Sequence, residues 1–206
     1  MRIFLALILM QVFVLTAQAN DKPTHLKAPN GNLMDELDPF SSDIQQTLEK
    51  LDKEYLKQTG KLPFLETHLG LGPDCYRLAC SVYVQVVKSE QKLYLYLNGH
   101  QENMWQVSTG RLGHSTPDFD VHPDGRIYDA YSSHNFPGGN YNGLGNMPYA
   151  VFIQDGFAIH GTTEGNWPKL GTAASHGCVR LHPTNGKIFN RLVRQYGVQD
   201  VWVTIL

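Results

Sequence analysis

The strongest constraint on the fold lies near the middle of the chain, where Asn98-Gly99 separates two runs of strand-forming residues. Asn-Gly is the preferred centre of a two-residue hairpin turn, because both turn positions need a positive φ. The run Leu93 to Leu97 alternates leucine with tyrosine, and a return strand is expected near Met104 to Val107. The β-branched run Val82 to Val87 precedes them. The sequence therefore predicts a sheet that begins at about residue 82.

A second hairpin is expected later in the chain, around the turn Asp155-Gly156. Tyr149 to Ile153 and Phe157 to His160 form its two strands, so that His160 emerges at the end of a strand. Val201 to Ile205 is predicted as the last strand. Because 42% of the residues are hydrophobic and 17% are charged, the composition is that of an ordinary globular protein. These strands are therefore expected to contribute to a folded core.

Two amphipathic helices are predicted outside the strands, over residues 42–59 and from about residue 185 to 196. The first helix repeats apolar residues at helical spacing, at Ile44, Leu48, Leu51 and Tyr55. We expect this apolar stripe to pack on the rest of the protein, and binding of a partner is the alternative. Residues 113–146 are rich in Gly, Asn, Pro, Ser and His without periodicity, which predicts a long loop region with a binding or a structural role.

The first nineteen residues are expected to be a secretory signal peptide. Arg2 precedes an apolar run at residues 3–15, and the small-residue exit Ala17-Gln18-Ala19 indicates cleavage before Asn20. The run is shorter than the roughly 20 residues that cross a bilayer, although an uncleaved signal could tether the protein. No later stretch is apolar enough to span a membrane. We therefore expect a protein of the periplasm or cell envelope.

Three cysteines are present, at positions 75, 80 and 178. An odd number in an oxidising compartment leaves at least one cysteine free or paired with another chain. Cys75 and Cys80 are close enough in sequence for a local disulfide, and two unpaired buried thiols are the alternative. In either case Cys178 is left over.

The most informative stretch is Ser175-His176-Gly177-Cys178-Val179-Arg180, which Ile159-His160-Gly161 precedes. An imidazole beside a thiol favours the thiolate, which is the nucleophilic form. The flexible Gly177 would let the consecutive amides of residues 176 to 178 point at one spot and hold an oxyanion. Arg180 could pair with a carboxylate of the substrate. These residue types together indicate acyl transfer.

Other kinds of site fit the sequence less well. A metal could be held by His160, His176 and Cys178, with His182 as a fourth ligand, but neither the Cys-x-x-Cys nor the His-Glu-x-x-His spacing is present. Redox exchange would need a second cysteine close in sequence to Cys178. Nucleic-acid binding is not expected, because the formal net charge is −2 and no basic face is evident. We expect neither a metal nor another cofactor.

From His160 to Arg180 the sequence resembles the signature of the L,D-transpeptidase catalytic domain, also called the YkuD domain. Further matching pieces are Leu93-Tyr94-Leu95-Tyr96 with Asn98-Gly99, Val107-Ser108-Thr109-Gly110, Met147-Pro148-Tyr149 and Gly156-Phe157-Ala158-Ile159-His160-Gly161. The resemblance implies a mostly β-sandwich fold with few helices, in a catalytic domain over residues 81–206. Residues 20–80 would then be an N-terminal extension that carries the first helix.

The resemblance also implies a role for each site residue. Cys178 would attack the peptidoglycan tetrapeptide stem, release the terminal D-alanine and hold the rest as a thioester. His160 would be its base, oriented by the carbonyl of Gly161, and His176 a supporting histidine. The amides of His176, Gly177 and Cys178 would form the oxyanion hole. Substrate contacts are expected from Arg180, Ser175, Met147 and Tyr149.

One departure from the family pattern concerns the acceptor. Family members usually carry Thr-Pro-x-Gly-x-Phe, whereas here Thr116-Pro117 runs into Asp118-Phe119-Asp120 without that glycine. The resemblance implies an amine acceptor, from another stem, a D-amino acid or an envelope protein, whereas the changed loop makes water the alternative. With water, the enzyme would be an L,D-carboxypeptidase or a hydrolase that detaches material from the wall. An inactive wall-binding module is a third hypothesis.

Overall fold

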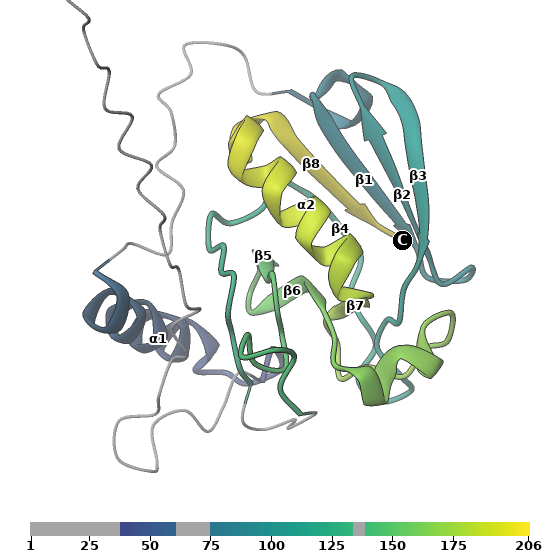
Figure 1. Cartoon of the computed structure of the whole chain (residues 1–206). Helices are drawn as coiled ribbons and strands as arrows, with labels where there is room; N and C mark the ends of the chain where they lie inside the picture. Colours follow the sequence, from purple (N-terminus) through teal and green to yellow (C-terminus); the bar gives the residue numbers. More distant parts are fainter. Residues whose placement is uncertain (1–37, 61–74, 134–138) are drawn as a thin grey trace, which may run out of the picture.

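The computed structural model describes residues 38–60, 75–133 and 139–206 of the chain. The predicted signal peptide at residues 1–19 lies outside these ranges. Two sheets face each other, and helix α2 (Pro183–Tyr196) lies beside both of them, whereas helix α1 (Ile44–Thr59) lies on the far side of the smaller sheet (Figure 1). Within the described ranges no helix is long and apolar enough to cross a membrane.

The larger sheet has five strands in the order β3-β2-β1-β8-β4. Their bounds are β1 (Val82–Val87), β2 (Lys92–Leu97), β3 (His100–Gln106), β4 (Phe119–Val121) and β8 (Val201–Ile205). The turn between β2 and β3 is the predicted one, with φ values of 50° at Asn98 and 80° at Gly99. The first hairpin and the last strand are confirmed. The return strand starts at His100, earlier than expected, because β3 is an exposed edge strand with polar residues at its start.

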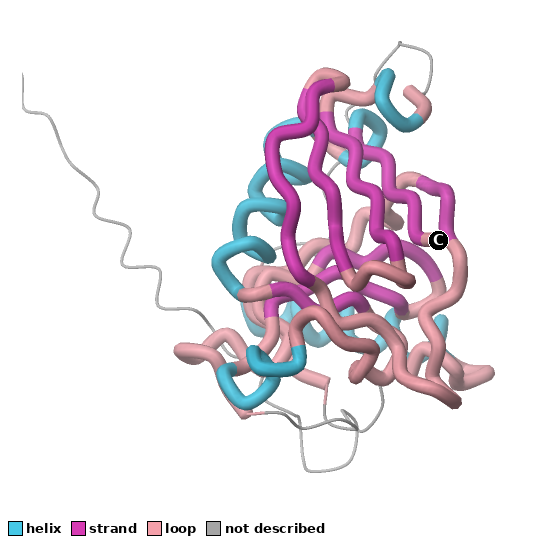
Figure 2. Tube along the Cα trace, turned by 90° about the vertical axis from the view of Figure 1, so that its right-hand side faces the viewer, coloured by secondary structure: helices cyan, strands magenta, loops and turns pink. Residues whose placement is uncertain are grey.

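The smaller sheet has the order β5-β6-β7, with β5 (Val151–Gln154), β6 (Phe157–Gly161) and β7 (Val179–Leu181). β5 and β6 form the predicted second hairpin, and β7 joins β6 in parallel. In the parallel register Ile159 faces Val179, and His160 faces Arg180. Because side chains alternate between the two faces of a strand, His160 and Arg180 share one face, whereas Ile159 and Val179 share the other. In Figure 2 the strands of this sheet run across the lower end of the larger one.

The main hydrophobic core lies between the two sheets. Ile159, Val179 and Leu181 enter it from the smaller sheet, opposite valines of β1 and β8. α2 closes one side of the core with Phe189 and Val193, which are fully buried. The helix begins with Pro183, two residues before its predicted start, at a first-turn position where the missing N–H of proline costs no hydrogen bond.

The predicted first helix is confirmed as α1, and it packs on the rest of the protein. Its buried side chains are Ile44, Leu48 and Leu51, with Tyr55 half-buried. They contact the face of the smaller sheet that is turned away from the main core, where Phe152 and Ala158 lie. α1 therefore adds a third layer outside the β5-β6-β7 sheet.

Two short strands and three short helical turns were not predicted. The strands are β4, inside the stretch predicted as loop, and β7, directly after Cys178. A three-residue strand carries too little alternation to be recognised in a sequence. The helical turns are η1 (Arg77–Ala79), η2 (Glu164–Lys169) and η3 (Val198–Asp200).

The structure joins Cys75 and Cys80 by a disulfide, with 4.9 Å between their Cα atoms, and leaves Cys178 free. Cys80 is buried. The bridge fixes the segment that leads into β1. The alternative of two unpaired thiols at Cys75 and Cys80 is therefore not what the structure contains.

Asp120 of β4 ties this lead-in to the larger sheet. Its carboxylate accepts two hydrogen bonds from Arg77, at 2.9 and 3.1 Å, and one from Tyr76 at 3.1 Å. It also accepts hydrogen bonds from Trp202 at 2.8 Å and Thr204 at 2.7 Å, both on β8. These donors, Arg77 first among them, hold the pKa of the Asp120 carboxyl well below its usual range.

Replacing Asp120 by alanine is expected to lower the free energy of unfolding by about 1–3 kcal/mol, because several hydrogen bonds to one charged acceptor are lost. Urea titration of wild type and variant measures the difference. Since the folded-state pKa is depressed, the contribution is fully present above the unfolded pKa of about 3.9 and is lost as the pH falls below it. Asp118→Ala is the matched control, because the Asp118 side chain is 78% exposed and pairs only with Lys88. An equal loss in both variants would contradict the assignment.

Candidate active site

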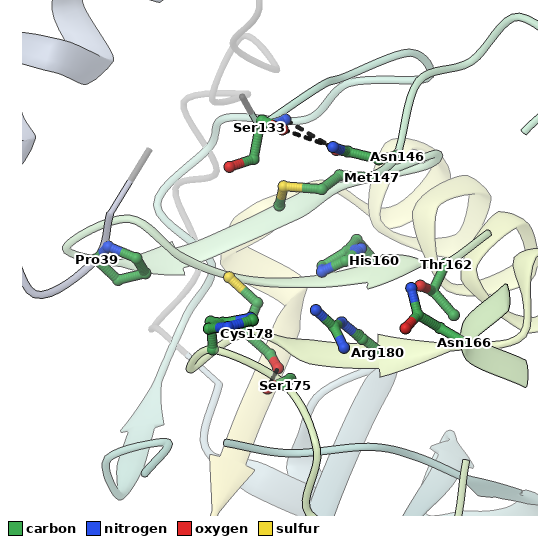
Figure 3. A pocket seen from close by; sticks show the side chains of 11 residues that line it. Pro39, Ser133, Asn146, Met147, His160, Thr162, Asn166, Ser175, Cys178 and Arg180 are labelled. Carbon is green, nitrogen blue, oxygen red and sulfur yellow. Dashed lines mark hydrogen bonds between the residues drawn. The ribbon is translucent and has the colours of Figure 1, made fainter. Parts of the chain in front are cut away.

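The parallel pairing of β6 with β7 decides which side chains meet at the site. His160 lies directly beside Arg180 in this register. Cys178 comes immediately before β7, so it lies beside Ala158, two residues before His160 on the same face. Cys178, His160 and Arg180 line one pocket, and their side chains lie around the same cavity in Figure 3.

The turn that carries Cys178 is held by Ser175. The Ser175 hydroxyl donates to the carbonyl of Cys178 at 2.6 Å and accepts the N–H of Gly177 at 3.1 Å. Gly177 has a φ of 122°, in the region that favours glycine. Ser175 lines the pocket and is fully buried. It was expected to contact substrate, and its hydrogen bonds give it the additional task of fixing the turn.

Thr116 holds the same turn from a distant part of the chain. Its hydroxyl donates to the carbonyl of Gly177 at 2.6 Å and accepts the N–H of Gly110 at 2.9 Å. Thr116 is buried, and it opens the stretch that departs from the family pattern. This role was not predicted from the sequence, although the Thr116-Pro117 pair matches the start of the family pattern.

The Cys178 thiol is neutral at physiological pH. The residue is half-buried, and its S–H donates to the carbonyl of Gly156 over 3.8 Å. Burial raises the pKa of the thiol to about 11, although the N–H of Ala158 and the charge of Arg180 act in the opposite direction. The expectation that a nearby imidazole would lower this pKa is therefore not met, because burial outweighs the other effects.

His160 is held in one tautomer by the backbone. Its Nδ1 lies 2.6 Å from the carbonyl oxygen of Gly161, and since a carbonyl only accepts, Nδ1 carries the hydrogen. The other ring nitrogen, Nε2, is then the acceptor. Burial lowers the pKa of His160 to about 3, and the charge of Arg180 adds to this effect. The ring is therefore neutral at physiological pH.

His176 also lines the pocket, but it is more open than His160. Burial lowers the pKa of His176 to about 4, with help from the positive charges of Arg111 and Arg180. Its ring packs edge-to-face with that of His114, with 5.4 Å between the centroids. The two histidines that the sequence could not rank therefore differ in burial and in how their rings are held.

Arg180 places a positive charge in the pocket lining. It is half-buried in the pocket, and its Nη1 donates to the carbonyl of Ala174 at 3.2 Å. Among the described residues, no Asp or Glu lies within ion-pair distance of its guanidinium. Burial lowers the pKa of Arg180. A half-buried guanidinium at a pocket wall is suited to an anionic ligand.

One of the two expected contacts from the 147–149 segment reaches the pocket. Met147 lines it, whereas Tyr149 does not. The backbone of Tyr149 is left-handed, with a φ of 59°, and its ring lies against Lys187 and Arg191 of α2. Tyr149 therefore contacts α2 at a place away from the pocket lining.

The amides expected to form an oxyanion hole are not equally available. The N–H of Gly177 is donated to Ser175, so this amide is engaged inside the protein. The partner of the Gly177 N–H is therefore the Ser175 hydroxyl. The expectation of three amides that converge on one acceptor is corrected in this respect.

Several pocket residues were not anticipated from the sequence. They are Pro39, Ser133, Asn146, Thr162 and Asn166. The Asn146 side chain accepts the N–H of Ser133 at 2.8 Å and donates to its carbonyl at 2.5 Å, as Figure 3 shows. This pair joins two parts of the pocket lining that are 13 residues apart in sequence. Only the richness of residues 113–146 in Asn and Ser was a signal, and that signal gave no position.

A metal site was considered for the same side chains. In the described part of the chain, no group of three or more His, Cys, Asp or Glu residues is arranged to hold a metal ion. His182, the fourth ligand considered, caps α2, where its Nδ1 accepts the N–H of Thr184 at 3.3 Å.

The comparison with solved structures returns L,D-transpeptidases. One in complex with imipenem shares 20% sequence identity, over 62% of this chain and 60% of that one, with a TM-score of 0.50. An L,D-transpeptidase from Mycobacterium smegmatis shares 16% over 62% and 59%, with a TM-score of 0.48. One from Xylanimonas cellulosilytica shares 21% over 78% and 69%, with a TM-score of 0.47. The chain spans about 60% of the length of the first two. At these identities the likeness concerns the fold alone.

The comparison with protein families is more specific. No match was found among curated proteins. The sequence model of the L,D-transpeptidase catalytic domain matches residues 81–199, which is more than half of the chain and includes Cys178, His160 and Arg180. The resemblance inferred from the His160 to Arg180 signature is thereby confirmed, and the mostly β fold in two sheets agrees with it. The protein belongs to the L,D-transpeptidase catalytic domain family.

Proposed function

We propose that the protein is a cysteine-dependent L,D-transpeptidase that acts on peptidoglycan tetrapeptide stems in the cell envelope. The observation that carries the proposal is one pocket that holds a neutral thiol, a neutral imidazole with a fixed tautomer and an unpaired guanidinium. These groups belong to Cys178, His160 and Arg180. Together they supply a nucleophile, a base and an anion site, and the chemistry requires no cofactor.

In the first step, the sulfur of Cys178 attacks the carbonyl carbon between the L-centre of the diamino acid and D-alanine. Because the thiol pKa is about 11, the S–H proton must leave as the S–C bond forms, and Nε2 of His160 is the acceptor. The tetrahedral intermediate then breaks its C–N bond. His160 returns the proton to the departing amine, so that D-alanine leaves and a thioester remains.

The developing oxyanion needs at least one donor near the sulfur. Since Gly177 donates to Ser175, we assign this role to the amide of Cys178 itself. Ser175 and Thr116 then act as positioning residues. They fix the carbonyls of Cys178 and Gly177, and thereby the plane of the intervening amide.

In the second step, an amine attacks the thioester carbon. The amine gives its proton to His160 as it displaces the sulfur. His160 then gives this proton to the departing sulfur, so that the thiol of Cys178 is restored. The acceptor is an amine of another stem, a D-amino acid or an envelope protein. Export by the predicted signal peptide would bring the enzyme to these partners.

Arg180 is the proposed anchor for a carboxylate of the stem peptide. Its guanidinium is half-buried beside the imidazole of His160 and lacks a protein carboxylate among the described residues. Because a charged hydrogen bond in a shielded site is stronger than one in water, a substrate carboxylate would gain binding energy there. Burial keeps His160 unprotonated, and the positive charge of Arg180 adds to this effect.

Water is the second candidate acceptor. The observation that favours water is the departure from the family pattern after Thr116-Pro117. The glycine of that pattern is absent from Asp118-Phe119-Asp120, and the chain continues into a short strand. Hydrolysis of the same thioester would make the enzyme an L,D-carboxypeptidase. Both candidates share the acylation step and differ only in what resolves it.

Incubation with tetrapeptide muropeptides, followed by mass spectrometry, tests the acylation step and the acceptor together. Wild type is expected to release D-alanine, and Cys178→Ala to release none, because the attacking sulfur is gone. Dimers, or exchange with an added D-amino acid, indicate transfer, whereas tripeptide alone indicates hydrolysis. A Cys75→Ala/Cys80→Ala double variant is the control and should retain release. Wild type without release would contradict the proposed attack on the tetrapeptide.

The pH dependence of kcat/KM tests the neutral pair. With the pKa of His160 at about 3 and that of Cys178 at about 11, the reactive forms persist across the neutral range. We expect kcat/KM for D-alanine release to be flat between about pH 5 and 9. A bell-shaped profile with an inflection between about pH 6 and 7 would instead indicate a thiolate–imidazolium pair.

Arg180→Gln tests the carboxylate anchor. Loss of one charge-assisted contact is expected to lower kcat/KM for the tetrapeptide by roughly 10- to 100-fold. The matched control is Arg191→Gln, because Arg191, which lies on α2, pairs with Asp129 and does not line the pocket. Steady-state rates of D-alanine release measure both variants. Equal rates for the two would remove Arg180 from substrate binding.

A further inference from the structure

The residues just before α1 reach the pocket from outside the range that matches the family. Pro39 is buried and lines the pocket together with Cys178 and His160. Figure 3 draws Pro39 and His160 on opposite sides of the cavity, with the Cys178 sulfur between them in this view. The family match begins only at residue 81. One wall of the pocket therefore comes from a part of the chain that the family does not define.

The same N-terminal segment packs on both glycines that flank the thiol. Gly156 supplies the carbonyl that accepts the S–H, and a Cβ atom there would lie 2.7 Å from the side chain of Ile44. Gly177 directly precedes Cys178, and a Cβ atom there would lie 3.0 Å from the ring of Phe40. Both glycines have a positive φ, of 80° and 122°. Ile44 and Phe40 therefore occupy the space next to the two backbone positions that orient the sulfur.

Phe40 also connects this wall to the aromatic side chains around the pocket. Its ring packs edge-to-face on Phe157, with 5.4 Å between centroids, and on His114, with 5.8 Å. His114 in turn contacts His176, which lines the pocket. Such contacts hold rings in defined orientations and add to the energy of apolar burial. Phe40 itself is still 48% exposed, so it lies on the rim and not in the core.

α1 fixes the position of this segment at two points. Near its start, Gln45 donates to Asp155 at 3.1 Å, in the turn that also holds Gly156. Further along the helix, Asp52 accepts hydrogen bonds from Arg126 at 3.0 Å and from Tyr128 at 2.6 Å. The Asp52 and Arg126 side chains are only 12% and 14% exposed, so solvent screens this pair little.

We propose that residues 38–44, which end at the first residue of α1, are part of the active site, and that Phe40 is a positioning residue that, with Pro39, shields and orients the Cys178 thiol. The proposal rests on the proposed role of Cys178 as the nucleophile. In this proposal, Pro39 and Phe40 exclude water from the sulfur and prevent the turn at Gly177 from moving outward. Both effects favour attack along a fixed direction.

The groups that act electrostatically on the thiol come from other elements. His160 of β6 and Arg180 of β7 line the same pocket, and the charge of Tyr131 would be coupled to that of the thiolate. Asp38, just before the wall, acts on His176. Pro39 and Phe40 carry no charge. Removing the Phe40 ring therefore changes the surroundings of the sulfur mainly by admitting water, which lowers the cost of ionising it.

The test compares Phe40→Ala with Phe40→Leu, which keeps most of the apolar bulk, in the full chain. Leu56→Ala is the matched control, because Leu56 is an apolar residue of similar exposure, 42% against 48% for Phe40, on α1 and outside the pocket lining. Two readouts are measured: the pH profile of Cys178 alkylation by iodoacetamide, and kcat and KM for D-alanine release from the tetrapeptide. Thermal unfolding verifies that each variant is folded.

For Phe40→Ala we expect the alkylation midpoint to move to lower pH than in wild type, and kcat to fall roughly tenfold with little change in KM. Phe40→Leu should recover most of both, and Leu56→Ala should match wild type. Phe40→Ala that behaves like Leu56→Ala, or that unfolds globally, would overturn the proposal. The alkylation readout needs no substrate. If wild type releases no D-alanine, the proposed function fails, while the midpoint still decides whether the wall shields the thiol.

Discussion

The parallel hydrogen bonding between β6 and β7 is the constraint on which the candidate site depends. The register that buries Ile159 and Val179 in the main core also turns His160, Arg180 and the preceding Cys178 to the opposite face. A slip by one residue would exchange the two sets and bury the guanidinium among valines and leucines. The free energy of core packing therefore protects the geometry of the site.

The electrostatics of the site follow from its position between two packed layers. The smaller sheet has the main core on one face and α1 on the other, so the groups near Cys178 lose much of their hydration. Burial moves the pKa of the thiol up and those of His160 and His176 down, so that all three are neutral at rest. Arg180 is the exception, because a guanidinium stays charged. Among the described residues that line the pocket, Arg180 therefore carries a positive charge beside a thiol and two imidazoles that are neutral.

The sequence predicted those features that are written in local patterns. The hairpin at Asn98-Gly99, helix α1 and the strand that ends near His160 each have a periodicity or a turn signal of their own, and the structure contains all three. The family followed from a short signature around Cys178. Patterns of this kind do not encode burial, and for that reason the expected fall in the thiol pKa became a rise. The placement of Tyr149 was missed for a related reason, since its left-handed backbone breaks the alternation of the strand that follows.

The remaining features depend on contacts between parts of the chain that are far apart in sequence. Thr116 and Phe40 both contact Gly177, and no local pattern in the sequence predicts either contact. The glycines on the other side of these contacts carry the clearer signal. Gly156 and Gly177 have backbone conformations that favour glycine, and they also lack room for a side chain because the N-terminal segment occupies it. A glycine can therefore be required by its neighbours as well as by its own φ, and here the two requirements coincide at the two positions that flank the Cys178 thiol.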